Sequence, residues 1–146
     1  MSPQVLGLVI GGLLPAIFFG LFAIFSKSSN SLGIALGYYL LLLGLAVVLI
    51  GFACLLIFPD RVISFASGRD AFLSGCTWAI GSALVAIALS RYHVPISQLV
   101  PLYNMNTLVA VLLGLWIFSE WQDINFTKLF TGSLLIIIGG TLVAWA

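Results

Sequence analysis

Residues 32–58 read LGIALGYYLLLLGLAVVLIGFACLLIF and contain no charged side chain. As a helix rising 1.5 Å per residue, this stretch is longer than the roughly 30 Å hydrocarbon core of a bilayer is thick. Its apolar residues do not alternate with polar ones, as they would in a strand of a transmembrane barrel. Because lipid offers the backbone no hydrogen-bonding partner, a helix is the structure that suits these residues within a membrane. The stretch therefore predicts a membrane-spanning helix.

Four other stretches share this character, and short clusters of charged residues separate them. The chain of 146 residues is 62% hydrophobic and 6% charged, with a mean hydropathy of +1.27. Soluble domains are roughly 45–50% apolar and about 25% charged, so the composition excludes a soluble enzyme, a nucleic-acid-binding protein and a disordered chain. We expect an all-α integral membrane protein, multi-pass in the plasma (cytoplasmic or inner) membrane. Its single domain, residues 1–146, is expected to be one compact bundle of five transmembrane helices, at about 5–25, 32–58, 71–90, 94–119 and 129–146.

The charges say little about orientation. The first stretch has no basic residue before it and is too long for the apolar region of a signal peptide, so we interpret it as a span. Five spans place the two ends of the chain on opposite sides of the membrane. An excess of Lys and Arg marks the cytoplasmic side. Here one side carries Arg61, Arg69 and Lys128 and the other carries Lys27 and Arg91, which is almost no bias. Either weak cues or a partner orient the protein, or it has dual topology and pairs head to tail.

Ionisable side chains are absent from the centre of every predicted span. Such groups usually mark ion sites and proton relays, so their absence argues against coupling to protons through a buried carboxylate and against strongly charged substrates. The sequence contains no nucleophile paired with a base and no cluster of metal ligands, and His93 lies alone in a loop. We expect no enzymatic activity, no metal and no cofactor. Cys54 and Cys76 are interpreted as reduced packing residues.

Small residues recur at helical spacing within the spans. Gly7 and Gly11 stand four apart, and Gly37, Gly44 and Gly51 follow at intervals of seven. Small side chains let helix backbones approach closely in lipid, where van der Waals packing replaces the hydrophobic drive. The pattern predicts a tightly packed bundle.

Two prolines lie well inside predicted spans, Pro15 in the first and Pro101 in the fourth. Each removes one helical hydrogen bond and clashes with the carbonyl four residues earlier. Such breaks are tolerated in membranes where neighbours, hydroxyl groups or a wet cavity satisfy the freed carbonyl. Each proline therefore marks either a simple kink or a kink that lines a cavity or acts as a hinge.

The fourth span contains most of the polar residues predicted to lie within the membrane. Asn104 and Asn106 fall near its centre, where an unpaired amide costs several kcal/mol. Hydrogen bonding between helices, worth about 1 kcal/mol each, is the ordinary explanation for such residues. The two asparagines point in nearly opposite directions on a helix, so we expect Asn104, which shares a face with Pro101, to face a cavity and Asn106 to bridge helices. The substrate-binding candidates in this span are Ser97, Tyr103, Asn104 and Thr107.

The third and second spans add aromatic candidates. Trp78 lies on one face of the third span with Ser74 and Ser82, roughly 12 Å from Asp70 along the helix. It is either a membrane anchor or part of a pocket, and we include it among the substrate-binding candidates. Of the adjacent Tyr38 and Tyr39 in the second span, we expect one to face inward and the other outward.

The last part of the chain resembles a known family. The run Pro101-Leu102-Tyr103-Asn104 is followed by an apolar span, Phe118-Ser119-Glu120, Gly132, and an apolar segment with Gly139-Gly140. This order is similar to the second half of an EamA-type repeat of the drug/metabolite transporter (DMT) superfamily. Ser119 stands where the family usually has a glycine before the glutamate, here Glu120. The first span, ending near Lys27, resembles the opening helix of the repeat, and residues 96–102 resemble the start of its fourth helix.

The resemblance implies a function and an assembly. Typical members carry two five-helix repeats in inverted orientation, the architecture of alternating-access carriers. This chain has one, which implies an antiparallel homodimer, a parallel dimer or a hetero-pair with a sister subunit. We expect a membrane transporter that moves a neutral or polar metabolite through a cavity at the dimer interface, with the lipid bilayer and that metabolite as its partners and no nucleic acid. The alternative is a non-transporting accessory or scaffold subunit of a larger membrane complex.

Overall fold

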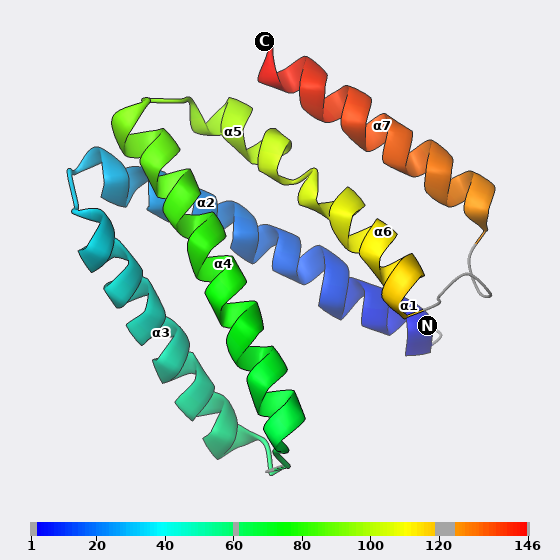
Figure 1. Ribbon diagram of the computed structural model, residues 1–146, viewed down its shortest axis with the longest axis horizontal. Coiled ribbons are helices and arrows are strands. Elements are labelled where there is room, and N and C mark those ends of the chain that lie inside the picture. Colours follow the sequence, from blue (N-terminus) through cyan, green and yellow to red (C-terminus); the bar gives the residue numbers. More distant parts are fainter. Residues whose placement is uncertain (1–2, 60–61, 119–124, 146) are drawn as a thin grey trace. The chain divides into compact units, whose positions relative to one another are not determined.

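The computed structural model describes residues 3–59, 62–118 and 125–145, with the backbone alone for Pro3 and Gln4. Every regular element within these ranges is helical (Figure 1). The elements are α1 (Pro3–Leu8), the π-helical turn η1 (Val9–Leu13), α2 (Leu14–Ser31), α3 (Leu36–Ile57), α4 (Phe65–Arg91), α5 (Ile96–Tyr103), α6 (Asn106–Ile117) and α7 (Phe126–Ala144).

Within the described residues, five helical segments are long and apolar enough to cross a membrane, which confirms the all-helical fold and the number of candidate spans. They are Val5–Ser31, Leu36–Ile57, Phe65–Arg91, Ile96–Ile117 and Phe126–Ala144. The first continues past Phe25, and the third begins at Phe65 rather than at residue 71. Charged residues at these ends do not stop the helix, because long side chains such as those of Lys27 and Arg69 can reach the polar region of the membrane.

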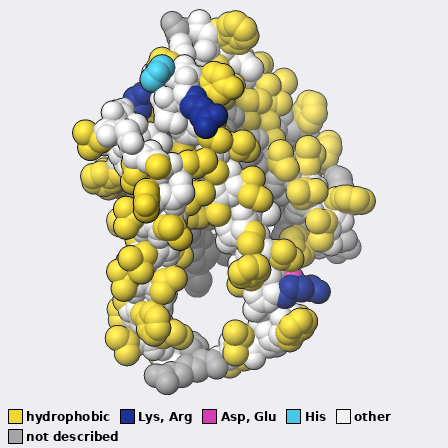
Figure 2. Space-filling view, turned by 60° about the vertical axis from the view of Figure 1, so that its left-hand side comes forward, with side chains coloured by type: hydrophobic (Ala, Val, Ile, Leu, Met, Phe, Trp, Pro, Cys, Tyr) yellow, Lys and Arg dark blue, Asp and Glu magenta, His cyan; other side chains and the backbone are white. Residues whose placement is uncertain are grey.

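The surface is predominantly apolar. Most of the large hydrophobic side chains in the described part of the chain are exposed. In the helix Leu36–Ile57, the 18-residue segment with the highest hydropathy contains no buried residue. Figure 2 shows one face covered largely by hydrophobic side chains, with the charged ones in small groups. A surface of this kind would associate in water, whereas lipid is a solvent that suits it. These features support a multi-pass integral membrane protein.

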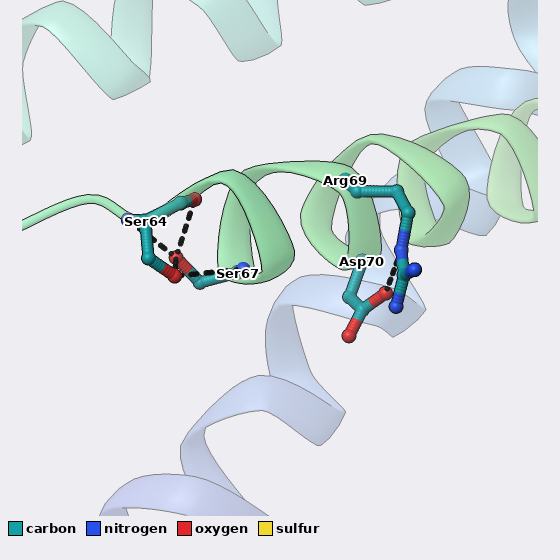
Figure 3. Close-up of polar contacts among 4 residues, drawn as sticks. All are labelled: Ser64, Ser67, Arg69 and Asp70. Atoms are coloured by element: carbon teal, nitrogen blue, oxygen red, sulfur yellow. Dashed lines mark hydrogen bonds and ion pairs between the residues drawn. The ribbon is translucent and has the colours of Figure 1, made fainter.

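Two serines cap the N-terminus of α4. The Ser67 N–H donates to Ser64 Oγ at 3.1 Å, and the Ser64 N–H donates to Ser67 Oγ at 3.0 Å (Figure 3). This reciprocal capping box satisfies two backbone donors that a helix start leaves without partners. One turn later, Arg69 Nε lies 2.9 Å from Asp70 Oδ1, and both side chains are exposed. The helix therefore begins in a polar segment before its apolar run.

Left-handed residues follow the ends of α2 and α4. After α2, the Gly33 N–H donates to the Asn30 carbonyl at 3.2 Å, and Gly33 has a φ of 82°. Glycine adopts this conformation without the steric cost that a Cβ brings. After α4, His93 has a φ of 52°, an uncommon conformation in which histidine is nevertheless enriched. Both residues let the chain leave its helix sharply.

Pro15 is accommodated by a π-helical turn rather than by a simple kink. Pro15 is the second residue of α2, directly after η1. The Leu14 N–H donates to the Val9 carbonyl, five residues earlier, so the turn before the proline is one residue wider than an α-helical turn. Single π-helical turns of this kind are a recognised cause of helix distortion. The predicted distortion at Pro15 is therefore present, and it takes the form of a π turn.

The helices divide into two compact units, residues 1–93 and residues 94–146, which we describe separately as the first and second units. In the first unit, α4 packs against both α2 and α3. Its buried apolar residues are Ala23 of α2, Tyr39 of α3, and Ala86 and Leu89 of α4. Three polar residues, Ser26, Asn30 and Ser82, are also buried. The core of this unit is therefore small and partly polar.

In the second unit, α5 packs against α7, and the two backbones come close at Gly140. A Cβ built on Gly140 would lie 3.2 Å from the carbonyl oxygen of Pro101 and 3.5 Å from Met105 Cγ. Gly140 is the buried residue of α7. By contrast, a Cβ on Gly7, Gly11 or Gly44 would meet nothing within 4 Å. The close approach expected of the glycines is thus seen at Gly140.

The contact at Gly140 gives a first prediction. Gly140→Ala should lower the free energy of unfolding by about 1–2 kcal/mol, because the added methyl group crowds the Pro101 carbonyl, which is backbone and cannot rotate away. The melting temperature of the purified protein in detergent would measure this. Gly139→Ala is the matched control, since its Cβ would have nothing within 4 Å. Equal melting temperatures for the two variants would contradict the assignment.

Candidate functional site

The fourth candidate span is broken near its middle. Helix α5 ends at Tyr103 and α6 begins at Asn106. Pro101 has no N–H to offer the Ser97 carbonyl, and the regular pattern then changes. The N–H groups of Met105, Thr107 and Leu108 each bond to the carbonyl three residues earlier, at 3.0–3.1 Å. This is the tighter 3₁₀ pattern, which often marks a functional hinge or strain when it occurs within a helix.

The side chains around the break are accessible within the chain. Asn104, Asn106 and Thr107 are exposed, whereas Pro101 and Tyr103 are half-buried. The Thr107 hydroxyl donates to the Asn104 carbonyl at 3.0 Å, so it helps to close the tight turn. Among the residues that the structure describes, neither asparagine side chain has a hydrogen-bonding partner. The break therefore presents two amide side chains at a central position of a candidate span.

The other candidates from the sequence lie at different places. Ser97 is exposed in the first turn of α5, on the same short helix as Pro101. The face predicted to be common to Pro101 and Asn104 requires an uninterrupted helix, and helix α5 ends at Tyr103. Glu120, the residue of the family motif, lies outside the described residues.

Trp78 belongs to the first unit. It is 42% exposed, and its ring centroid lies 5.9 Å from that of Phe22 at an interplanar angle of 44°. Tilted aromatic pairs at this distance add about 0.5–1.5 kcal/mol beyond the burial of their area. Trp78 thus contributes to the packing of α4 on α2 while part of its ring remains accessible.

The structure also contains a polar cluster that the sequence analysis did not predict. The Ser26 Oγ lies 2.8 Å from the Tyr39 hydroxyl, and Asn30 Nδ2 donates to the Ser26 carbonyl at 2.9 Å. All three residues are at most 5% exposed. Tyr38 is 69% exposed, which confirms that one of the two adjacent tyrosines faces inward and the other outward. The four-residue spacing of Ser26 and Asn30 was the available signal, but the first span was predicted to end before it.

An open groove of about 260 Å³ runs beside this cluster between α2 and α3. Apolar side chains supply most of its lining, and the polar contributions come from serines and the buried tyrosine. The lining residues are Phe22, Phe25, Ser26, Ser29, Ile34, Tyr39, Leu42 and Leu43. The groove can therefore receive the apolar part of a ligand and offer hydroxyl groups to a polar part of the same ligand.

The described residues include no group of three or more side chains that could hold a metal ion. Cys54 and Cys76 are both free thiols. Around the break and along the groove, the side chains offer amide and hydroxyl groups for hydrogen bonding, together with aromatic and apolar contact.

Comparisons with known proteins found no family model, no curated protein and no solved structure that matches this chain. Functional inference therefore rests on the residues and their geometry.

The Ser26–Tyr39 hydrogen bond gives a second prediction. Tyr39→Phe should lower the free energy of unfolding by about 1 kcal/mol, because it removes a buried hydrogen bond between helices. A double-mutant cycle with Ser26→Ala, followed by thermal denaturation in detergent, would isolate the coupling between the two hydroxyls. Tyr38→Phe is the exposed control and should have no effect. A coupling energy of zero would show that the hydrogen bond between the two hydroxyls does not stabilise the packing of α2 against α3.

Proposed function

We propose that this chain is a subunit of a small membrane transporter in the plasma (cytoplasmic or inner) membrane. It would move a neutral or polar metabolite by alternating access. The substrate would contact Asn104, Tyr103, Ser97 and Thr107 of the second unit. The observation that carries the proposal is the break between α5 and α6, with its two exposed amide side chains.

The physical argument begins from the cost of a polar group in lipid. An amide without a hydrogen-bonding partner in an apolar medium costs several kcal/mol. The break lies near the middle of Ile96–Ile117, where the hydrocarbon core would surround it if nothing covered it. Non-helical backbone at that depth is tolerated where protein or a water-filled cavity covers it. Carriers use discontinuous helices of this kind to form binding sites near the midplane.

The choice of a neutral or polar substrate follows from where the charges lie. Within the described part of the chain, the charged side chains are near the ends of the candidate spans, at Lys27, Arg69, Asp70, Arg91 and Lys128. Amide, hydroxyl and aromatic groups remain for recognition around the break. These groups suit an uncharged molecule with several hydrogen-bonding groups.

The proposed assembly is an antiparallel homodimer. A second, inverted copy would cover the broken helix and rebuild the inverted-repeat arrangement that the resemblance to a single EamA-type repeat implies. The three-to-two distribution of Lys and Arg favours insertion in both orientations, because it gives little preference for either one. The hinges for alternating access would be the π-helical turn that precedes Pro15 and the break between α5 and α6 that follows Pro101.

A third prediction concerns Asn104. Neutral metabolites that raise the melting temperature of the purified protein would be tested for uptake into proteoliposomes. Asn104→Leu should reduce that uptake by at least about ten-fold, since it removes hydrogen bonds worth about 1.5 kcal/mol or more from the site. Val109→Leu, an exposed position of α6, is the control and should transport normally. Unchanged uptake by Asn104→Leu at equal protein levels would contradict the site.

A fourth prediction concerns orientation. A topology reporter fused after Ala146 should give signal from both sides of the membrane, because the loop charges hardly distinguish them. Signal from a single side would exclude the antiparallel homodimer. Purification with a partner in stoichiometric amount would instead favour a hetero-pair or the accessory subunit of a larger complex.

A further inference from the structure

We propose that the groove between α2 and α3 is a binding site for an anionic phospholipid. One acyl chain would lie in the groove, with its ester group at the hydroxyls of the groove and its phosphate at the basic end of the first unit. This inference does not depend on transport. It rests on the lining of the groove, the depth of its hydroxyls and the charge at that end.

The lining suits an acyl chain. Phe22, Phe25, Leu42 and Leu43 are among the apolar residues that form the groove. Its volume of about 260 Å³ lies just below the roughly 300–1,000 Å³ of pockets that enclose drug-sized ligands. The groove is open along its length, so it can receive part of an extended chain from the surrounding bilayer without any opening movement.

The hydroxyls lie at the depth of the lipid ester groups. Ser26 is five residues before the end of α2 at Ser31, and Tyr39 is three residues after the start of α3 at Leu36. At 1.5 Å per residue these positions are roughly 5–8 Å from the helix ends. The polar region of a bilayer is about 5–8 Å thick on each side, since the membrane measures about 40–45 Å overall around a 30 Å core. The polar part of the groove therefore falls at the boundary between headgroups and acyl chains.

Ser29 supplies a hydroxyl for the ligand. The Ser26 hydroxyl and the Tyr39 hydroxyl bond to each other, whereas Ser29 lines the groove one turn nearer the membrane surface. Ser29 is half-buried, so a group in the groove can reach it. An ester carbonyl is an acceptor, and it would take the hydrogen bond from this serine.

The charge at the same end selects an anionic headgroup. Helices α2 and α4 run in the same direction, so Lys27 near the end of α2 and Arg91 at the end of α4 lie at one end of the first unit (Figure 1). Basic and histidine side chains gather at this end in Figure 2. Among the residues described, Asp70 is the one acidic side chain, and it lies at the start of α4, paired with Arg69. The two cations thus have no acidic partner in the described chain, and basic residues at a membrane surface attract anionic lipids.

Native mass spectrometry would test the site. The purified protein in detergent would be given equal amounts of phosphatidylglycerol, which is anionic, and phosphatidylcholine, which has no net charge. We expect one tightly held lipid per chain, with phosphatidylglycerol favoured by about five-fold for each basic side chain involved. The double variant Lys27→Gln, Arg91→Gln should bind the two lipids equally. A preference for phosphatidylglycerol that persists in this variant would overturn the proposal.

Substitutions of residues that line the groove distinguish lipid bound in the groove from lipid that contacts the rest of the apolar surface. Leu43→Trp should fill the groove and abolish the tightly held lipid. Leu41→Trp is the matched control, because Leu41 is 71% exposed on the same helix and does not line the groove. If Leu43→Trp fails to fold, as judged by circular dichroism, Ser29→Leu serves instead and should weaken retention. Equal lipid retention by the groove variant and the Leu41→Trp control would overturn the site.

Discussion

The structure depends on one constraint: a polar group placed in lipid must find its partner within protein or water. The first unit satisfies this constraint internally. The buried Ser26 and Tyr39 hydroxyls bond to each other between α2 and α3, and the buried Asn30 amide donates to the Ser26 carbonyl within α2. In the second unit, the break between α5 and α6 exposes two amide side chains that have no hydrogen-bonding partner among the described residues. The two units therefore differ in whether the described residues supply partners for their polar side chains.

Much of the fold could be predicted from the sequence, because a long uncharged run has one stable structure in a bilayer. The five spans and the inward-facing tyrosine follow from hydropathy and from the side-chain directions of a helix. The helix ends were predicted less well. Hydropathy places the first end at Phe25, whereas the hydrogen bonds of Ser26 and Asn30 carry the helix on to Ser31. The Asn30 bond is local to α2, whereas the Ser26 hydroxyl bonds to Tyr39 of α3, a contact that hydropathy does not report.

The candidate site could be predicted only in part. Pro101 correctly marks a disturbance, but the chain leaves the helix at Asn104, where backbone bonds shift to the tighter pattern. The place of that shift depends on neighbouring packing, including the Pro101 carbonyl against Gly140. Glycine spacing has the same limit, since it indicates where two backbones are able to meet and not where they do.

The π-helical turn before Pro15 changes which residues of the first candidate span share a face. The hydrogen bond from the Leu14 N–H to the Val9 carbonyl closes a turn that contains one residue more than an α-helical turn. Residues on either side are therefore out of phase by about 100°, the rotation of a single helical residue. Gly7 and Gly20 cannot be assigned to a common stripe by counting straight through the turn.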